Sequence, residues 1–188
     1  MNFFSLFKRK IIYKFKKKYS IDNDSFSKKN LDYLFHYYGS DKSNIFKINN
    51  SPGHGFSLLY ENHLRNLIGR NINILEIGSF AGASAAAFVK YFQNANIFCF
   101  DVNISNFKYT SKNIHVYGID VKNKKKVKKT LIEIFNKNDF KKFDLIIDDG
   151  SHQLSDILHS LNFFFKYLKK EGTFIIEDYK HPNYYKYN

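Results

Sequence analysis

The stretch "INILEIGSFAGASAAAFVKYF" (residues 72–92) contains three consecutive patterns that together decide the fold. Its apolar beginning predicts a buried strand at 72–78, and its alanine-rich second half predicts a helix at 83–92. Between them, Gly78 permits a tight turn and Gly82 permits a close approach to the backbone. The first turn of the helix also offers free N–H groups. A strand, a glycine loop and a helix in this order are typical of a nucleotide-binding unit in an α/β fold.

The rest of the chain repeats this alternation of short apolar runs and helical patterns. The further strands are predicted at 95–101, 113–120, 143–149 and 173–178. The further helices are predicted at 31–38, around 58–67, at 125–137 and at 153–170. Together they predict an α/β fold, a doubly wound, mainly parallel Rossmann-like sheet covered on both faces.

The predicted domain organisation has two parts. Residues 1–36 are expected to form a basic N-terminal helical segment that caps the domain, and residues 37–188 the α/β domain itself. Little sequence follows the fifth strand, so the sheet is expected to lack the last strands of a larger fold of this class.

Composition excludes several classes of protein. Hydrophobic residues make up 44% of the chain and aromatic residues 19%, which excludes wholesale disorder. The one cysteine, Cys99, lies in the apolar run "IFCF" and fits a reducing compartment. No apolar run approaches the roughly 20 residues that span a bilayer, and the first residues do not resemble a secretory signal. We therefore expect a cytoplasmic protein.

The net charge of +13 raises the question of an anionic partner. Basic residues cluster at 8–18 and again in "KNKKKVKK" at 122–129. The second cluster fits the solvated face of a surface helix, and we expect no specific binding of nucleic acid. The first is compatible with a basic amphipathic segment, for which we expect weak, salt-sensitive contact with an anionic membrane or a partner. The chain is also a candidate for a homo-oligomer.

Three acidic residues lie at or near the carboxyl ends of consecutive strands. Glu76 precedes the glycine loop, where it disfavours phosphate and suits a cationic ligand, and the pattern matches neither the dinucleotide nor the P-loop motif. Asp101 could accept hydrogen bonds from both hydroxyls of a ribose, and Asp120 could meet an adenine amino group. The order favours S-adenosylmethionine over a plain glycine-rich turn. The residues predicted to bind it are Glu76, Gly78, Ser79, Gly82, Asp101, Asp120 and Asp148.

Paired carboxylates follow the fourth and fifth strands, in "LIIDDGSHQ" (145–153) and "GTFIIED" (172–178). Because neighbouring parallel strands lie about 4.8 Å apart, carboxylates at their ends can share one cation. Oxygen ligands suit a hard ion such as Mg²⁺. Two polar strand-to-helix turns are the alternative explanation of the same pattern.

These motifs resemble class I S-adenosylmethionine-dependent methyltransferases. Within them, "YYGSDKS", "HGFSLLYENHL", "FDLIIDDGSHQ" and "GTFIIED" resemble the metal-dependent sugar O-methyltransferases of macrolide and surface-polysaccharide biosynthesis. The resemblance implies that Asp149, Glu177 and Asp178 hold magnesium and that His152 is the general base. Asp148 is expected to orient its neighbours or contact the cofactor.

The resulting expectation is a Mg²⁺-assisted O-methyltransferase acting on a sugar hydroxyl of a nucleotide sugar, a glycan or a glycosylated metabolite. Two alternatives stay open, a methyltransferase for a non-sugar hydroxyl and a truncated, non-catalytic fold that only binds ligands. A nucleic-acid base methylase is disfavoured, because "DDGS" stands where such enzymes carry an Asn/Asp-Pro-Pro-aromatic motif.

Overall fold

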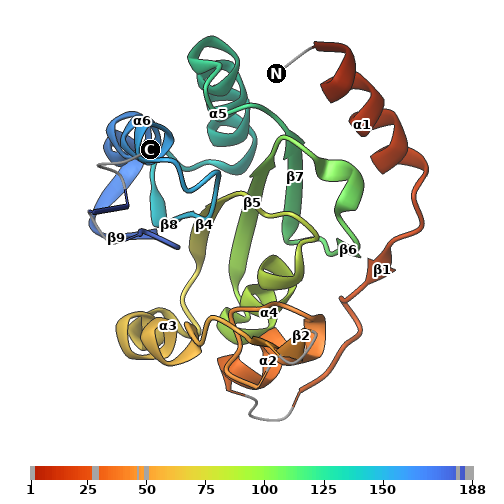
Figure 1. The fold of residues 1–188 in the computed structure, drawn as a ribbon, viewed down its shortest axis with the longest axis vertical. Helices are drawn as coiled ribbons and strands as arrows, with labels where there is room; N and C mark the ends of the chain where they lie inside the picture. Colours follow the sequence, from red (N-terminus) through yellow and green to blue (C-terminus); the bar gives the residue numbers. More distant parts are fainter. Residues whose placement is uncertain (1–2, 27–29, 46, 49–50, 181–182, 185–188) are drawn as a thin grey trace.

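The computed structural model describes residues 3–26, 30–45, 47–48, 51–180 and 183–184. Its centre is a five-stranded parallel sheet in the order β7-β5-β4-β8-β9 (Figure 1). The strands are β4 (Ile72–Ile77), β5 (Ala95–Asp101), β7 (Ile114–Gly118), β8 (Phe143–Asp148) and β9 (Leu168–Ile176). In chain order, the sheet begins with β4 in its middle and adds β5 and β7 toward one edge. It then adds β8 and β9 on the other side of β4. This confirms the predicted doubly wound, Rossmann-like fold.

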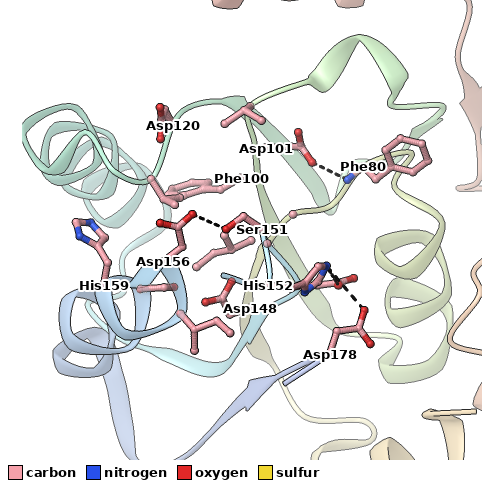
Figure 2. A pocket seen from close by; sticks show the side chains of 18 of the residues that line it. Phe80, Phe100, Asp101, Asp120, Asp148, Ser151, His152, Asp156, His159 and Asp178 are labelled. Carbon is pink, nitrogen blue, oxygen red and sulfur yellow. Dashed lines mark hydrogen bonds and ion pairs between the residues drawn. The ribbon is translucent and has the colours of Figure 1, made fainter. Parts of the chain in front are cut away.

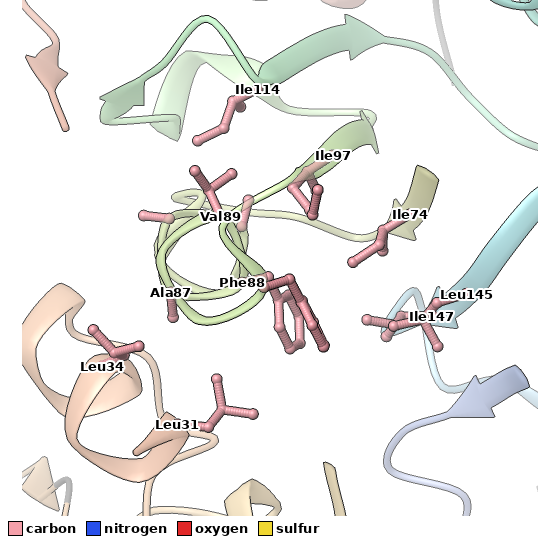
Figure 3. Close-up of a cluster of buried hydrophobic side chains, with 14 of the residues drawn as sticks. Leu31, Leu34, Ile74, Ala87, Phe88, Val89, Ile97, Ile114, Leu145 and Ile147 are labelled. Carbon is pink, nitrogen blue, oxygen red and sulfur yellow. The ribbon is translucent and has the colours of Figure 1, made fainter. Parts of the chain in front are cut away.

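Helices cover both faces of the sheet, as the continuous apolar strands require. One layer contains α2 (Leu31–Tyr38), α3 (Ser57–Leu64) and α4 (Ala83–Phe92), and the other contains α5 (Lys124–Asn138) and α6 (Leu154–Phe164). Successive residues of β4 point to opposite layers. Ile74 packs in the same cluster as Phe88 of α4 (Figure 3). Leu75 packs on the other face, in the cluster formed with α5 and α6.

Three short helices complete the chain between these elements, namely η1 (Arg65–Leu67), η2 (Ile104–Asn106) and η3 (Phe165–Tyr167). Four two-residue strands form two small ladders. β1 (Tyr19–Ser20) pairs in parallel with β6 (Tyr109–Thr110), and β2 (Lys47–Ile48) pairs antiparallel with β3 (Ser51–Pro52). The β1–β6 ladder links the N-terminal segment to the connection between β5 and β7.

The N-terminal segment begins with helix α1 (Phe3–Phe15), beside the turn that follows β5 (Figure 1). Tyr13 contacts the buried Phe107 ring edge-on, with ring centroids 6.4 Å apart. An N-terminal helix was therefore predicted correctly. No described helix has both the length and the apolarity that crossing a membrane demands.

The helix predicted at 153–170 is wrong only at its C-terminal end. α6 ends at Phe164, and residues from Leu168 onward already belong to β9, where Leu168 pairs with Phe143 of β8. Gly172 makes this possible, because a Cβ there would lie 2.8 Å from the Leu168 side chain and 3.0 Å from the Asp144 carbonyl oxygen. Burial of Leu168 in the sheet thus overrides the helical spacing that it shares with α6.

The predicted apolar side of the helix at 58–67 is only partly correct. Leu64 and Leu67 are buried, but Leu58 and Leu59 are exposed. The buried positions in the first turn of α3 are Ser57 and Tyr60 instead. Both make polar contacts with side chains that are distant in sequence, which a pattern of apolar residues does not reveal.

Candidate functional site

The carboxyl ends of the central strands open into a cavity of about 770 Å³ (Figure 2). It lies where the strand order reverses, between β4 and β8, which is the usual ligand position in an open α/β sheet. Of the predicted cofactor-binding residues, Gly78, Asp101, Asp120 and Asp148 line this cavity. Ser79 lines a smaller adjoining cavity of about 180 Å³, together with Gly78. Glu76 and Gly82 line neither cavity.

Backbone hydrogen bonds link the carboxyl end of β4 to the carboxyl ends of β5 and β8. Gly78 N–H donates to the Phe100 carbonyl oxygen at 2.8 Å, and Asp149 N–H donates to the Ile77 carbonyl oxygen at 2.9 Å. Gly78 has a φ of 86°, and a Cβ added to it would lie 1.9 Å from the carbonyl oxygen of Asp149. Only glycine fits this position, so the glycine loop and the "DDGSH" turn are packed against each other.

Gly82 serves a different contact from the one predicted. Its φ is 76°, and a Cβ there would lie 2.3 Å from the ring of Phe107. The close approach that Gly82 allows is therefore to an aromatic ring of the core. The ligand contact predicted for Gly82 stays a prediction.

The two carboxylates expected to face the ribose and the base are both held by backbone N–H groups. Asp101 accepts from Phe80 N–H at 2.8 Å and from Asn103 N–H at 2.5 Å (Figure 2). Asp120 accepts from Lys122 N–H at 3.0 Å. Because a carboxylate oxygen has two lone pairs, both groups can also accept hydrogen bonds from a ligand in the cavity.

Glu76 is buried beneath the glycine loop. One carboxylate oxygen accepts a hydrogen bond from the Ser84 hydroxyl, and the other has no hydrogen-bond partner among the described residues. Burial raises the pKa of Glu76. A buried carboxylate oxygen without a partner fits a site that a polar ligand group completes.

Asp149, His152 and Asp178 form a cluster at the rim of the cavity, which we call the acidic cluster. One ligand atom of each lies within 4.8 Å of the others. His152 Nε2 is 3.9 Å from Asp149 Oδ1 and 3.8 Å from Asp178 Oδ2. All three side chains are partly exposed, and Figure 2 shows His152 beside Asp178. His54 Nδ1 lies 3.5 Å from the second oxygen of Asp178.

Glu177 lies below this cluster and is almost fully buried. One of its oxygens is 2.5 Å from Lys42 Nζ, and the other accepts a hydrogen bond from the Tyr60 hydroxyl. The same ammonium group is 2.5 Å from Asp149 Oδ2. Burial alone would lower the pKa of Lys42, but the Glu177 and Asp149 carboxylates outweigh it and raise that pKa.

The donor set of the acidic cluster fits a hard divalent cation. Two carboxylates from neighbouring strand ends supply oxygen ligands, and the open side toward the cavity leaves room for further oxygens. Imidazole is a poor ligand for Mg²⁺, which leaves His152 available for proton transfer. The structure brings together Asp149, Asp178 and His152, whose metal-binding and catalytic roles stay predictions. It places Glu177 in the pair with Lys42, so its metal-binding role stays a prediction.

Sequence reasoning missed Lys42 and Tyr60. Lys42 lies in "YYGSDKS", a segment that carries the family resemblance, but nothing in that segment points to Lys42 itself. Tyr60 lies in "HGFSLLYENHL", where it follows two exposed leucines. The one signal in the sequence that could have pointed to Lys42 and Tyr60 is that both lie in segments that resemble the same family.

Comparison with known proteins agrees with this architecture. Residues 75–179, more than half of the chain, match a family of methyltransferase domains. No curated protein matches the chain.

The solved structures that it resembles include MycE, a methyltransferase from the mycinamycin biosynthetic pathway, in complex with Mg and SAH. The TM-score is 0.65, with 24% identity over 81% of this chain and 40% of MycE. MycE in complex with Mg, SAH and mycinamycin VI gives a TM-score of 0.64 and 24% identity, over 80% and 39% of the two chains. This chain thus spans about 40% of the length of those structures.

A more distant fold match is a ribosomal RNA methyltransferase from Plasmodium falciparum. It has a TM-score of 0.52 and 18% identity, over 71% of this chain and 81% of that one. The strand order, the cavity at the switch point and the family match agree with the resemblance seen in the sequence. The chain belongs to the family of methyltransferase domains.

Proposed function

We propose that this protein is an S-adenosylmethionine-dependent, magnesium-assisted O-methyltransferase that acts on a sugar hydroxyl. The observation that carries the proposal is the meeting of two residue groups in one cavity. Asp101 and Asp120 lie on one side of it, and Asp149, His152 and Asp178 lie on the other. The first group suits the adenosine part of a methyl donor, and the second suits a cation and an acceptor hydroxyl.

The donor side is formed by fixed polar groups. Asp101 is oriented by two backbone N–H groups, so its remaining lone pairs are directed and can accept from ribose hydroxyls. The apolar walls at Ile77, Phe100 and Ile119 suit a flat base. S-adenosylmethionine supplies an activated methyl group, and the chain's part is to hold it in line with the acceptor.

The acceptor side combines charge with a base. Asp149 and Asp178 would hold Mg²⁺, which supplies Lewis acidity and a fixed position for the acceptor. His152 Nε2 accepts the proton of the hydroxyl, and the carboxylates at 3.8 and 3.9 Å stabilise the resulting imidazolium. Lys42 contacts Glu177 below and one oxygen of Asp149, which leaves the other oxygen of Asp149 and the carboxylate of Asp178 to face a cation.

MycE has been crystallised with Mg, SAH and a macrolide, mycinamycin VI. That complex supports a small-molecule acceptor for this chain. We extend it to sugars because the motifs resemble sugar O-methyltransferases.

The decisive experiment is a transfer assay with isotope-labelled S-adenosylmethionine, Mg²⁺ and a panel of nucleotide sugars and glycosides. We expect label on a sugar hydroxyl, and none after chelation of the metal. Label on a catechol alone would assign a non-sugar hydroxyl acceptor. Calorimetric binding of the donor without transfer to any acceptor would assign a ligand-binding module, and tight binding of NAD without binding of the donor would overturn the proposal.

A further inference from the structure

Helix α1 directs its large apolar side chains away from the sheet. Phe7, Ile11, Ile12 and Phe15 are all exposed, from 44% for the two isoleucines to 78% for Phe15. Residues 7, 11 and 15 are four positions apart, so they lie on one side of the helix. The apolar side of a surface helix normally faces the core. In α1, Tyr13 packs on the core against Phe107, whereas these four residues point outward, and we call the four the α1 apolar face.

The opposite side of α1 is attached to the protein by basic side chains. Arg9 Nη1 donates to the carbonyl oxygen of Val102 at 3.0 Å. Lys16 Nζ, one residue beyond the helix, donates to the carbonyl oxygens of Ser105 and Asn106 at 2.9 and 3.1 Å. These contacts fix the rotation of the helix about its axis. The outward direction of the α1 apolar face is therefore a consequence of how the helix docks.

Exposed cations border the α1 apolar face. Lys8 and Lys14 are exposed on the same helix, and Lys14 Nζ is 5.8 Å from the centroid of the Phe15 ring. Lys10 packs its stem against Gly118, where a Cβ would be 3.0 Å from Lys10 Cε.

That contact brings α1 to the end of β7, close to the basic helix α5 (Figure 1). Burial and then the charge of Lys10 lower the pKa of Lys126 on that helix, so the two basic clusters of the sequence meet. The exposed lysines of the second cluster are Lys122, Lys124, Lys125, Lys128 and Lys129.

We propose that α1 docks this protein on an anionic lipid surface, with the α1 apolar face inserted at the level of the headgroups. Apolar side chains flanked by lysines match the two layers of such a surface, acyl chains below and phosphates above. A second copy of the chain fits less well, because pairing two such faces would bring like charges together in a molecule of net charge +13. Nucleic acid would match the charge but would leave the phenylalanines in water.

The docking also has a defined position relative to the cavity. Arg9 binds the carbonyl oxygen of Val102, and Val102 itself lines the large cavity. A protein docked through α1 would therefore hold that cavity close to the lipid surface. This inference does not depend on the methyl transfer proposed above.

A fluorescence measurement tests the proposal directly, because the chain contains no tryptophan. Phe7→Trp places a single indole on the α1 apolar face. We expect its emission to shift to shorter wavelength with vesicles of phosphatidylcholine and phosphatidylglycerol, and not with phosphatidylcholine alone. Removing two cations with Lys8→Gln and Lys14→Gln should weaken partitioning by roughly thirtyfold, at roughly fivefold for each cation near the surface.

A matched pair of variants separates the α1 apolar face from general hydrophobicity. Phe7 and Phe165 are 56% and 60% exposed, but Phe165 lies in η3 after α6. In vesicle flotation, Phe7→Ser should reduce binding by about tenfold or more, since a buried phenylalanine contributes most of its transfer energy. Phe165→Ser should leave binding unchanged, and both variants should retain the wild-type circular dichroism spectrum.

Three results would overturn the proposal. One is no binding of the wild-type chain to anionic vesicles at low salt. Another is an equal loss for Phe7→Ser and Phe165→Ser. The last is a lipid-free dimer in sedimentation that Phe7→Ser converts to monomer, which would assign the α1 apolar face to a second copy.

Discussion

Lys42 and Glu177 form a buried ion pair, 2.5 Å apart, between residues that are 135 positions apart in the chain. Each side chain is only 3% exposed. The pair sits beneath the acidic cluster, and Lys42 reaches Asp149 of that cluster as well. One lysine thus compensates the charge of a carboxylate below the site and of one within it.

Lys42→Met should therefore be strongly destabilising. It leaves Glu177 buried without its counter-charge, and breaking one partner of a buried pair typically costs about 3–5 kcal/mol of unfolding free energy. Urea unfolding measures this loss of unfolding free energy. Lys169→Met is the matched control, because Lys169 also lies 2.7 Å from a carboxylate, Asp144, but is 45% exposed. Its loss should cost about 1 kcal/mol or less.

The double variant Lys42→Met with Glu177→Gln should recover part of the lost stability, since no unpaired buried charge remains. A double variant as unstable as Lys42→Met alone would contradict the account of Lys42 as the counter-charge of Glu177.

His152→Ala should lower turnover without weakening the binding of S-adenosylmethionine. The loss of a general base typically reduces the rate by about 10²–10⁴-fold. Single-turnover transfer and calorimetry measure the two quantities separately. His36→Ala is the control, because His36 is exposed on α2 and lines neither cavity. Full activity of the His152 variant would remove the base from the mechanism.

Asp178→Asn should raise the Mg²⁺ concentration needed for transfer. Changes in the outer partners of a metal site already cost about 10–100-fold in affinity, so losing a ligand should cost at least as much. The backbone tolerates the change, because Asp178 has a φ of 53° and asparagine adopts this left-handed conformation readily.

Asp139→Asn is a matched control for that experiment, with a φ of 51° at the exposed end of α5. A magnesium titration of both variants should show a shift for Asp178→Asn alone. An Mg²⁺ requirement that is identical in the two would exclude Asp178 as a ligand, and activity that persists in EDTA would exclude the metal altogether.

Gly78→Ala should disrupt the site far more than Gly69→Ala. Both glycines have positive φ, 86° and 77°, so both substitutions carry a backbone cost of about 1–2 kcal/mol. A Cβ at Gly69 meets open space, whereas at Gly78 it collides with the carbonyl oxygen of Asp149. In thermal unfolding, Gly69→Ala should therefore lose only the backbone cost, whereas Gly78→Ala should lose more and should also weaken donor binding. Equal effects at the two positions would show that the collision is relieved without cost.

The parts of the fold that follow from local sequence were predicted well. β4, β5 and β8 are continuous apolar runs bounded by polar residues, and their ends were correct to within one residue. β9 begins at Leu168, five residues before the predicted start, because its first residues satisfy helical spacing as well as strand pairing. Only the contact with Phe143 of β8 decides between the two, and that contact is not encoded locally.

The residues of the candidate site also divide into those that the sequence predicts and those that it does not. Carboxylates at strand ends could be predicted to converge, because parallel strands deliver their carboxyl ends to one edge. Lys42 and Tyr60 reach Glu177 from 135 and 117 residues away, Lys42 from a loop and Tyr60 from α3, and the sequence does not specify where these segments lie relative to the sheet. The sequence therefore predicts the site residues that stand at the ends of strands. It does not predict those that other segments of the chain bring to the site.

The contact between Gly78 and the carbonyl group of Asp149 sets a distance that no side chain can adjust. The loop predicted to hold the methyl donor and the turn that carries the acidic cluster touch through backbone atoms, and a hydrogen bond from Asp149 N–H to Ile77 repeats the link one residue earlier. In the proposed mechanism, the main chain therefore sets the span between donor and acceptor. Side chains that line the cavity can therefore change to admit a different acceptor, while this backbone contact keeps the proposed alignment of the reacting groups the same.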